Sequence, residues 1–196
     1  MAGEKLDKDY WDNRYKNQQA GWDIGTVSTP LKEYIDQLGD KHIPILIPGC
    51  GNAYEAEYLL EHGFTNITVV DISFVAAQAV KEKLARYGTK LTVIHGDFFQ
   101  LQYKYQLILE QTFFCAIDPA LRKNYAEKMY ELLLPGGKLV GLFFNRQFDG
   151  GPPFSGNREE YLQLFAPLFN IIKMETAYNS ITPRSGTELF VLLQKG

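Results

Sequence analysis

The sequence predicts a single α/β domain built on one mostly parallel β-sheet with helices on both faces. Short apolar runs of strand type alternate with longer segments of helical type from about residue 40 onward. The chain has 196 residues with 45% hydrophobic content, which is enough for one well-buried core. The segment that joins the last two apolar runs is short and has no helical pattern. A parallel crossover needs more chain than this, so we expect these two strands to run antiparallel.

The strands follow from apolar runs that end at turn residues. They are expected at residues 43–47, 67–71, 91–95, 105–110, 138–144, 171–177 and 188–194. Residues 178–187 join the last pair. The prediction is therefore a seven-stranded, mostly parallel sheet with an antiparallel last strand.

The helices are predicted from residues whose side chains can accept a hydrogen bond from the first helical turn. These N-caps are Asn52 (with Glu55 completing a capping pair), Ser73, Asp118 (followed by a first-turn proline) and Asn157 (with Glu160). Their helices are expected to end near residues 62, 88, 134 and 165, and a further helix is expected at residues 31–38.

Composition excludes several classes of function. The net charge is −3 and no basic run is present, so nucleic acid is not an expected partner. No stretch approaches the length of a membrane span, and the first residues have no apolar signal region. Cys50 and Cys115 lie in apolar or glycine-rich surroundings, which indicates reduced thiols in a cytoplasmic protein. The three histidines show no metal-ligand spacing, so no metal is expected; a monomer is the default.

A glycine-rich turn follows the first strand and points to a nucleoside cofactor. Gly49 and Gly51 allow close backbone approach, and Asp71 ends the next strand, where a carboxylate can bind both ribose hydroxyls. Ala53 and Tyr54 stand where the dinucleotide fingerprint has its third glycine. S-adenosylmethionine, which has no pyrophosphate, therefore fits better than a nicotinamide dinucleotide.

Several motifs in the same order resemble the thiopurine S-methyltransferase family, which includes the halide/thiol methyltransferases. They are Trp11-Asp-Asn-Arg-Tyr15, Gly21-Trp-Asp-Ile-Gly25, Pro48-Gly-Cys-Gly51, Val70-Asp-Ile-Ser73, Gly96-Asp-Phe-Phe99, Thr112-Phe-Phe-Cys-Ala116, Leu134-Pro-Gly-Gly137 and Gly151-Pro-Pro-Phe154. The resemblance implies a class I methyltransferase with a Rossmann-like fold in residues 31–196. It also implies that residues 1–30 form an N-terminal lid segment over S-adenosylmethionine.

The resemblance also implies roles for individual residues. The expected roles are aromatic cover of the cofactor (Trp11, Tyr15, Trp22), backbone approach to its methionine part (Gly49), ribose binding (Asp71), adenine binding (Asp97, Phe98) and a contact after the fourth strand (Gln111). The middle lid position is Tyr15, where plant-type members resemble one another in having Trp.

Methyl transfer from a sulfonium is an in-line displacement, and a soft nucleophile with a low pKa needs no general base. No obvious catalytic His or Cys arrangement is present, so no catalytic residue is assigned and transfer to a small thiol or thiolate is favoured. The substrate-side candidates are Phe113, Phe114, Arg146, Phe154 and Arg184. Three alternatives stay open: an O- or N-acceptor, a nicotinamide-dependent oxidoreductase, and a protein that binds S-adenosylmethionine without catalysis.

Overall fold

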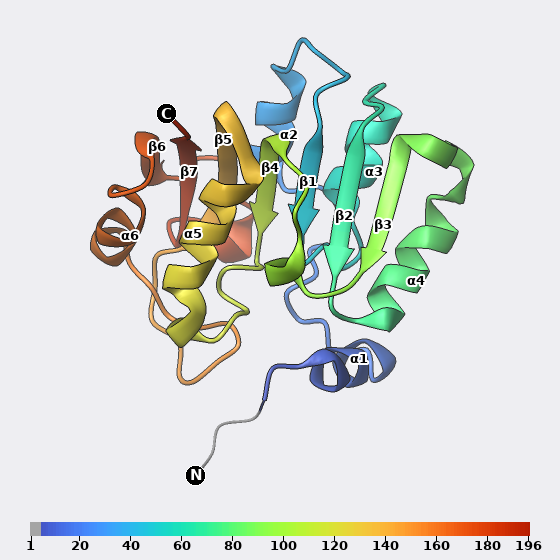
Figure 1. Ribbon diagram of the computed structural model, residues 1–196. Helices are drawn as coiled ribbons and strands as arrows, with labels where there is room; N and C mark the ends of the chain where they lie inside the picture. The colour runs from blue at the N-terminus through green and yellow to red at the C-terminus, as the bar shows by residue number, and fades with distance from the viewer. Residues whose placement is uncertain (1–4) are drawn as a thin grey trace.

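The computed structural model describes residues 5–196 and contains one seven-stranded sheet (Figure 1). The strand order is β3-β2-β1-β4-β5-β7-β6. The strands are β1 (Ile45–Pro48), β2 (Ile67–Asp71), β3 (Leu91–His95), β4 (Tyr105–Gln111), β5 (Leu133–Phe144), β6 (Asn170–Thr176) and β7 (Glu188–Gln194). Strands β1 to β5 pair in parallel, and β7 is antiparallel to both of its neighbours, β5 and β6. The predicted fold is confirmed.

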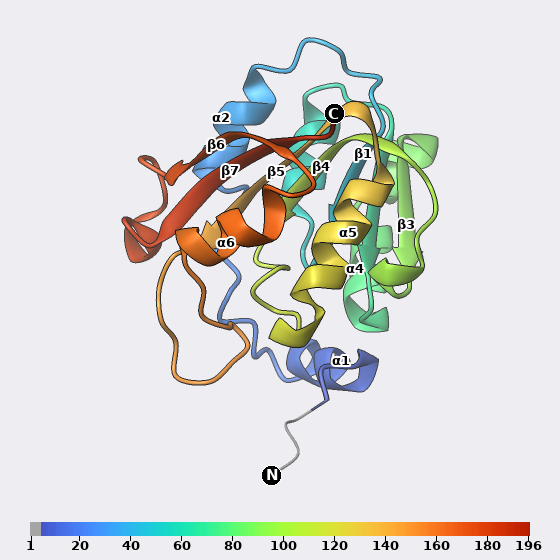
Figure 2. The same cartoon turned by 60° about the vertical axis from the view of Figure 1, so that its left-hand side comes forward.

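Helices cover both faces of the sheet, as the views in Figures 1 and 2 show. The helices are α1 (Lys8–Lys16), α2 (Thr29–Asp36), α3 (Tyr54–Glu61), α4 (Phe74–Lys83), α5 (Arg122–Leu132) and α6 (Arg158–Phe165). Buried side chains of α2, α3 and α4 share one core cluster with one face of the strands, and those of α5 and α6 share the other. This is the three-layer arrangement that a mostly parallel sheet requires to bury both faces.

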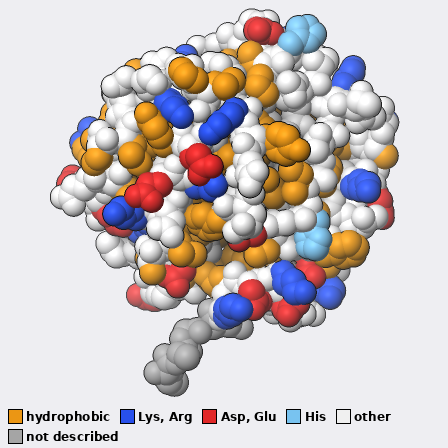
Figure 3. All heavy atoms as spheres, viewed as in Figure 1, with side chains coloured by type: hydrophobic (Ala, Val, Ile, Leu, Met, Phe, Trp, Pro, Cys, Tyr) orange, Lys and Arg blue, Asp and Glu red, His pale blue; other side chains and the backbone are white. Residues whose placement is uncertain are grey.

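The N-terminal segment lies outside these layers. In both views α1 lies at the end of the sheet where the parallel strands finish, together with the loop between β5 and α6. Figure 3 shows acidic and basic side chains together on the surface of α1. Ligands of open α/β sheets bind at this end, so α1 stands over the expected site. The first four residues of the predicted lid segment lie outside the described residues.

Three of the predicted N-caps are confirmed. Ser73 accepts a hydrogen bond from the Ala76 amide at 3.2 Å, and Asn157 accepts one from the Glu160 amide at 2.9 Å. Asp118 accepts one from an amide two residues on, although the turn that it starts is a 3-10 turn (Pro119–Leu121) that precedes α5. Local polar patterns therefore predicted the starts of α4 and α6, whereas α5 itself begins only at Arg122. Glu160, expected to complete the capping pair of Asn157, forms an ion pair with Arg122.

The predicted capping pair of Asn52 and Glu55 is wrong. The N-cap of α3 is Ala53, which has a left-handed backbone (φ 53°) and makes no side-chain capping bond. Glu55 is buried and accepts a hydrogen bond from the Ser28 amide at 3.1 Å, while Asn52 donates to Asp23. Both side chains form hydrogen bonds with the N-terminal segment instead. A local motif cannot predict such contacts between distant parts of the chain.

Some boundaries also differ from the prediction. Strand β5 begins at Leu133, so the Pro-Gly-Gly turn expected before the strand lies inside it, and α5 ends at Leu132. Helix α1 was not among the predicted helices. Within the described part of the chain, no helix is both long and apolar enough to cross a membrane.

Candidate functional site

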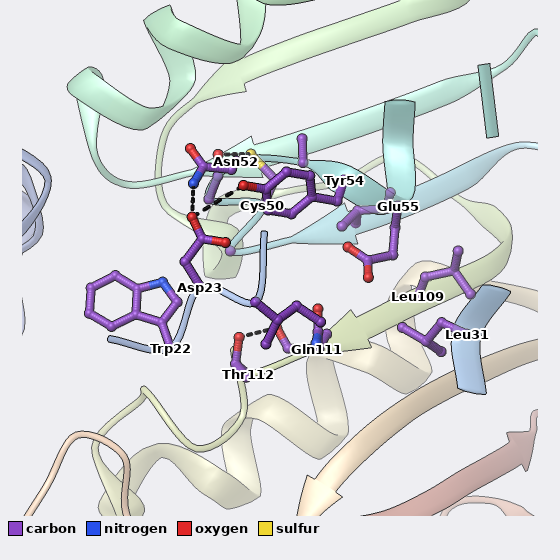
Figure 4. Close-up of a pocket in the computed structure, with 15 residues that line it drawn as sticks. Trp22, Asp23, Leu31, Cys50, Asn52, Tyr54, Glu55, Leu109, Gln111 and Thr112 are labelled. Atoms are coloured by element: carbon purple, nitrogen blue, oxygen red, sulfur yellow. Dashed lines mark hydrogen bonds between the residues drawn. The ribbon is translucent and has the colours of Figure 1, made fainter. Parts of the chain in front are cut away.

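A cavity of about 860 Å³ opens at the carboxyl end of the strands, bordered by α1 and the strand-end loops. A cavity of this size can hold a nucleoside cofactor and a small acceptor together. Its walls include seven of the eight predicted cofactor residues, namely Trp11, Tyr15, Trp22, Gly49, Asp71, Asp97 and Phe98. The eighth, Gln111, lines a small adjoining pocket that shares Trp22, Gly49 and Thr112 with the cavity (Figure 4).

In the glycine-rich turn after β1, Gly49 lines both spaces and Gly51 lines the smaller one. Gly49 and Gly51 both have left-handed backbones, with φ of 58° and 48°. A Cβ atom added at Gly49 would lie 2.4 Å from the ring of Phe113, so packing as well as conformation requires glycine there. The turn therefore presents bare backbone to a ligand.

Asp71 ends β2 with its carboxylate held in place from two sides. The amides of Gly51 and Ser73 donate to its two oxygens at 3.0 and 2.9 Å. Asp71 is 7% exposed, and burial raises its pKa although both amide bonds lower it. Each oxygen keeps a second lone pair, so the oriented carboxylate can still accept ribose hydroxyls.

The expected adenine residues follow β3. The carboxylate of Asp97 is exposed and accepts from the Phe99 amide at 2.9 Å, which starts a 3-10 turn (Phe98–Gln100). The ring of Phe98 borders the cavity but packs edge-on against Phe113, with centroids 5.2 Å apart, and is 4% exposed. Phe98 thus belongs to the core and reaches the cavity with one surface.

The aromatic residues of the predicted lid segment meet in one cluster. The ring centroids of Trp11 and Trp22 are 5.6 Å apart and those of Tyr15 and Trp22 are 5.8 Å apart, both edge-to-face. A Cβ atom at Gly51 would lie 3.1 Å from the Tyr15 hydroxyl, so this ring lies directly over the glycine turn. Burial raises the pKa of Tyr15, which keeps its phenol neutral.

The segment after α1 is tied to the domain by contacts that the sequence did not predict. The Asp23 carboxylate accepts hydrogen bonds from the Asn52 amide group and the Tyr54 hydroxyl, as Figure 4 shows. Arg184 donates to the Trp22 carbonyl at 2.6 Å. Asp23 lies within the Gly-Trp-Asp-Ile-Gly motif, which was the only signal that could have identified it.

The predicted substrate-side residues fall into different environments. Arg146 borders the cavity, with its guanidinium 4.8 Å from the Phe148 ring centroid. Arg184 borders it too, but is buried and paired with Glu188 at 3.1 Å, so its charge is neutralised. Phe154 is not among the residues lining the cavity, although Pro152 and Pro153 beside it are.

The two predicted phenylalanines after β4 also separate. Phe113 lines the cavity, whereas Phe114 is 1% exposed in the core. The amides of both donate to one oxygen of Glu110, at 2.7 and 2.8 Å. Glu110 is fully buried, which raises its pKa to about 8. This buried carboxyl therefore shapes the loop that carries Phe113.

Arg14 is a cation of the site that sequence reasoning missed. It borders the cavity from α1, with its guanidinium carbon 5.6 Å from the ring centroids of both Tyr10 and Trp22. Its Nε is buried without a hydrogen-bond partner in the structure. Within residues 5–196, neither Arg14 nor Arg146 forms an ion pair.

Backbone amides hold in place the carboxylates that line the cavity. They are Asp7, Asp71, Asp97 and Asp118. Each accepts at least one hydrogen bond from a backbone amide. No histidine is among the lining residues, and burial raises the pKa of the Cys115 thiol. Among residues 5–196, no group of three or more His, Cys, Asp or Glu side chains is placed to hold a metal.

Comparison with known proteins agrees with this geometry. The sequence model of the family described as Thiopurine S-methyltransferase (TPMT) matches residues 6–190. The chain is 30% identical to "Probable thiol methyltransferase 2" of Arabidopsis thaliana, over 91% of this chain and 81% of that protein. It is 29% identical to "Thiocyanate methyltransferase 1" of Brassica oleracea, over 94% and 84%.

A solved structure shares the fold. The 1,6-didemethyltoxoflavin-N1-methyltransferase of Burkholderia thailandensis, determined with S-adenosylhomocysteine, aligns with a TM-score of 0.76. The alignment covers 96% of this chain and 86% of that one at 17% sequence identity. At this identity the likeness concerns the fold.

Proposed function

Because this chain belongs to the thiopurine S-methyltransferase family, we propose that it transfers a methyl group to the sulfur of a small thiol or to a similarly soft anion. Family membership makes the protein an S-adenosylmethionine-dependent methyltransferase. The choice of acceptor is supported by the relatives whose names specify thiol and thiocyanate, and by the chemistry of the cavity wall.

The cofactor side is assigned residue by residue. Asp71 accepts from the ribose hydroxyls, and the backbone at Gly49 lies against the methionine part. Asp97 accepts from the adenine amino group, and the exposed surface of Phe98 packs on the adenine ring. Gln111 contacts the methionine part from the adjoining pocket. The fit of S-adenosylmethionine to these residues is supported by the glycine turn, which has no side chains in the way, and by the Asp71 carboxylate. Two amides orient this carboxylate, and each of its oxygens can accept a further hydrogen bond.

Bound S-adenosylmethionine supplies the methyl group as part of a sulfonium cation. The rings of Trp11, Tyr15 and Trp22 form an electron-rich wall, and an aromatic ring within about 6 Å attracts such a cation by about 0.5–2 kcal/mol. The same wall excludes water and limits the directions from which an acceptor can approach. We therefore propose that residues 1–30, as far as they are described, act as the lid.

The observation that carries the acceptor proposal is the absence of an available base on the described cavity wall. Of the lining aspartates, Asp71 and Asp97 are assigned to the cofactor, and Asp7 and Asp118 each accept a hydrogen bond from a backbone amide. The Tyr15 phenol is neutral, and burial keeps the Cys115 thiol protonated. An acceptor must therefore arrive already deprotonated, which thiols of low pKa and inorganic anions do at neutral pH.

The acceptor side favours a small anion. Phe144, Phe148 and Pro152 supply an apolar surface, while Arg14 and Arg146 bring positive charge and form no ion pair within the described chain. In partly desolvated surroundings these guanidiniums lower the free energy of a thiolate more than that of a neutral amine or alcohol. We also propose a cytoplasmic location, because both cysteines are free, buried thiols.

The test is a panel of acceptors assayed by transfer of isotopically labelled methyl groups from S-adenosylmethionine. Thiocyanate, iodide, hydrosulfide and aromatic thiols should be methylated far faster than phenols, carboxylates or amines of similar shape. The rate should follow the thiolate fraction as pH rises. Arg14→Met and Arg146→Met should raise KM for anionic acceptors and leave the cofactor KM within about twofold. Methylation of an amine or phenol but of no thiol or anion would refute the proposed acceptor class.

A further inference from the structure

A carboxylate on α1 reaches the first turn of α4. One oxygen of Asp12 accepts from the Ser73 hydroxyl at 2.6 Å and from the Val75 amide at 3.1 Å. Val75 is in the first turn of α4, where helix amides lack partners within the helix. The Asp12 side chain therefore caps α4 from a helix about sixty residues earlier in the chain.

Ser73 connects this contact to the cavity. Its hydroxyl donates to Asp12 and accepts from the Ala76 amide, while its own amide donates to Asp71 at 2.9 Å. Ser73 is fully buried, so water cannot replace a lost partner without a local opening. One residue thus holds α1 on one side and the Asp71 carboxylate on the other.

Electrostatics favour the same contact. Burial raises the pKa of Asp12, but the bonds from Ser73 and Val75, the charge of Lys16 and the Phe74 amide together lower it further, so the pKa is below its usual range and the group is ionised at neutral pH. A negative charge at a helix N-terminus is stabilised by the helix dipole, and hydrogen bonds to a carboxylate are about twice as strong as neutral ones.

We propose that Asp12 is a positioning residue for the cofactor: it latches α1 over the cavity and, through Ser73, couples the closed lid to Asp71. Trp11 and Tyr15 are on the same helix and line the cavity, so the docking of α1 determines where their rings lie. The latch rests on the assignment of Asp71 to the ribose in the proposed function. Since coupling between sites is reciprocal, a bound nucleoside should also strengthen the docking of α1.

The first test measures the affinity for S-adenosylhomocysteine by titration calorimetry, which requires no acceptor. Asp12→Ala should weaken binding about tenfold, mainly through faster dissociation. Asp12→Asn keeps an acceptor oxygen without the charge and should lie between Asp12→Ala and wild type. Asp9→Ala, which removes an exposed carboxylate from the same helix, should stay within twofold of wild type. For Asp12→Ala, KM for S-adenosylmethionine should rise while kcat at saturating cofactor is retained.

The second test asks whether Asp12 affects the affinity through Ser73 and Asp71 or only by holding α1 in place. It is a double-mutant cycle with Asp71→Asn. If the effect passes through Asp71, Asp12→Ala loses at least half of its effect on affinity when Asp71 is already replaced. Fully additive effects, or an Asp12→Ala affinity within twofold of wild type, would overturn the proposal. Wild-type protein that binds no S-adenosylhomocysteine would overturn the cofactor assignment and the latch with it. Intact binding with no methylation of thiols would refute only the acceptor class.

Discussion

Replacing Glu110 by glutamine should remove the loss of folding stability that ionisation of this residue causes as pH rises. Glu110 is fully buried at the end of β4, and one of its oxygens accepts from the amides of Phe113 and Phe114. The other oxygen has no partner among the described residues. Glutamine has nearly the same shape and retains an oxygen for both amides, but it cannot ionise.

The magnitude follows from the difference in pKa between the folded and unfolded states. Burial raises the folded pKa to about 8, against 4.5 for an exposed glutamate. The folded protein therefore holds a proton that the unfolded chain releases, and this contribution to stability is complete below pH 4.5 and lost as pH rises toward 8. At about 1.4 kcal/mol per pH unit, the loss is about 3–5 kcal/mol over this window.

The assay is urea unfolding of wild type and Glu110→Gln between pH 5 and pH 8.5. The difference in unfolding free energy, variant minus wild type, should rise with pH by about 3–5 kcal/mol. Asp71, another buried acid with a raised pKa, titrates in both proteins and cancels in the difference. Glu127→Gln, at an exposed position of α5, is the matched control and should show no such trend.

A constant difference across this pH range would refute the reasoning, because it would mean that Glu110 is ionised in the folded state at pH 5. A variant that fails to fold at every pH would also contradict it, since both amides retain an acceptor in Glu110→Gln.

Three further predictions concern binding and the lid. Asp71→Ala should weaken S-adenosylhomocysteine binding by about ten- to a hundredfold in calorimetry, through loss of charge-assisted bonds to two hydroxyls; an unchanged affinity in a folded variant would exclude the ribose assignment. Limited proteolysis should cut residues 17–20 in the free protein, and the nucleoside should suppress the cut; equal cutting in both states would argue for fixed anchors. Arg184→Met leaves Glu188 buried without its partner and should cost about 3–5 kcal/mol in chemical denaturation, whereas a loss below 1 kcal/mol would show that the pair is not structural.

The fold and the gathering of the proposed cofactor residues at one edge of the sheet were predictable because they depend on local or strictly periodic features. Apolar runs predict strands, and the carboxyl ends of parallel strands meet at one edge whatever the loops do. Asp71, Asp97 and Gln111 each stand at or just after a strand end, so their convergence on the cavity and its adjoining pocket follows from strand assignment alone. The cap at Ser73 was equally local.

The substrate side was less predictable because loop geometry decides it. Arg184 is four residues before Glu188, a spacing that favours ion pairs in helices, yet here a 3-10 turn and the start of β7 bring the two together. Phe154 was expected beside the acceptor, but it lies outside the cavity wall, while Phe148 from the same loop lines it. Arg14 was missed because the lid motif was interpreted through its aromatic residues.

The proposed lid segment shows most clearly what a local pattern cannot predict. Its path is fixed by polar contacts over long sequence distances: Asp12 with α4, Asp23 with the start of α3, and the Ser28 amide with the buried Glu55. Between the first two anchors, residues 17–19 are exposed, and Gln18 has a left-handed backbone (φ 54°). A lid held at both ends of this stretch can open only by releasing one of them. Ser73 bonds to both Asp12 and Asp71. A nucleoside bound to Asp71 should therefore oppose release of the Asp12 anchor.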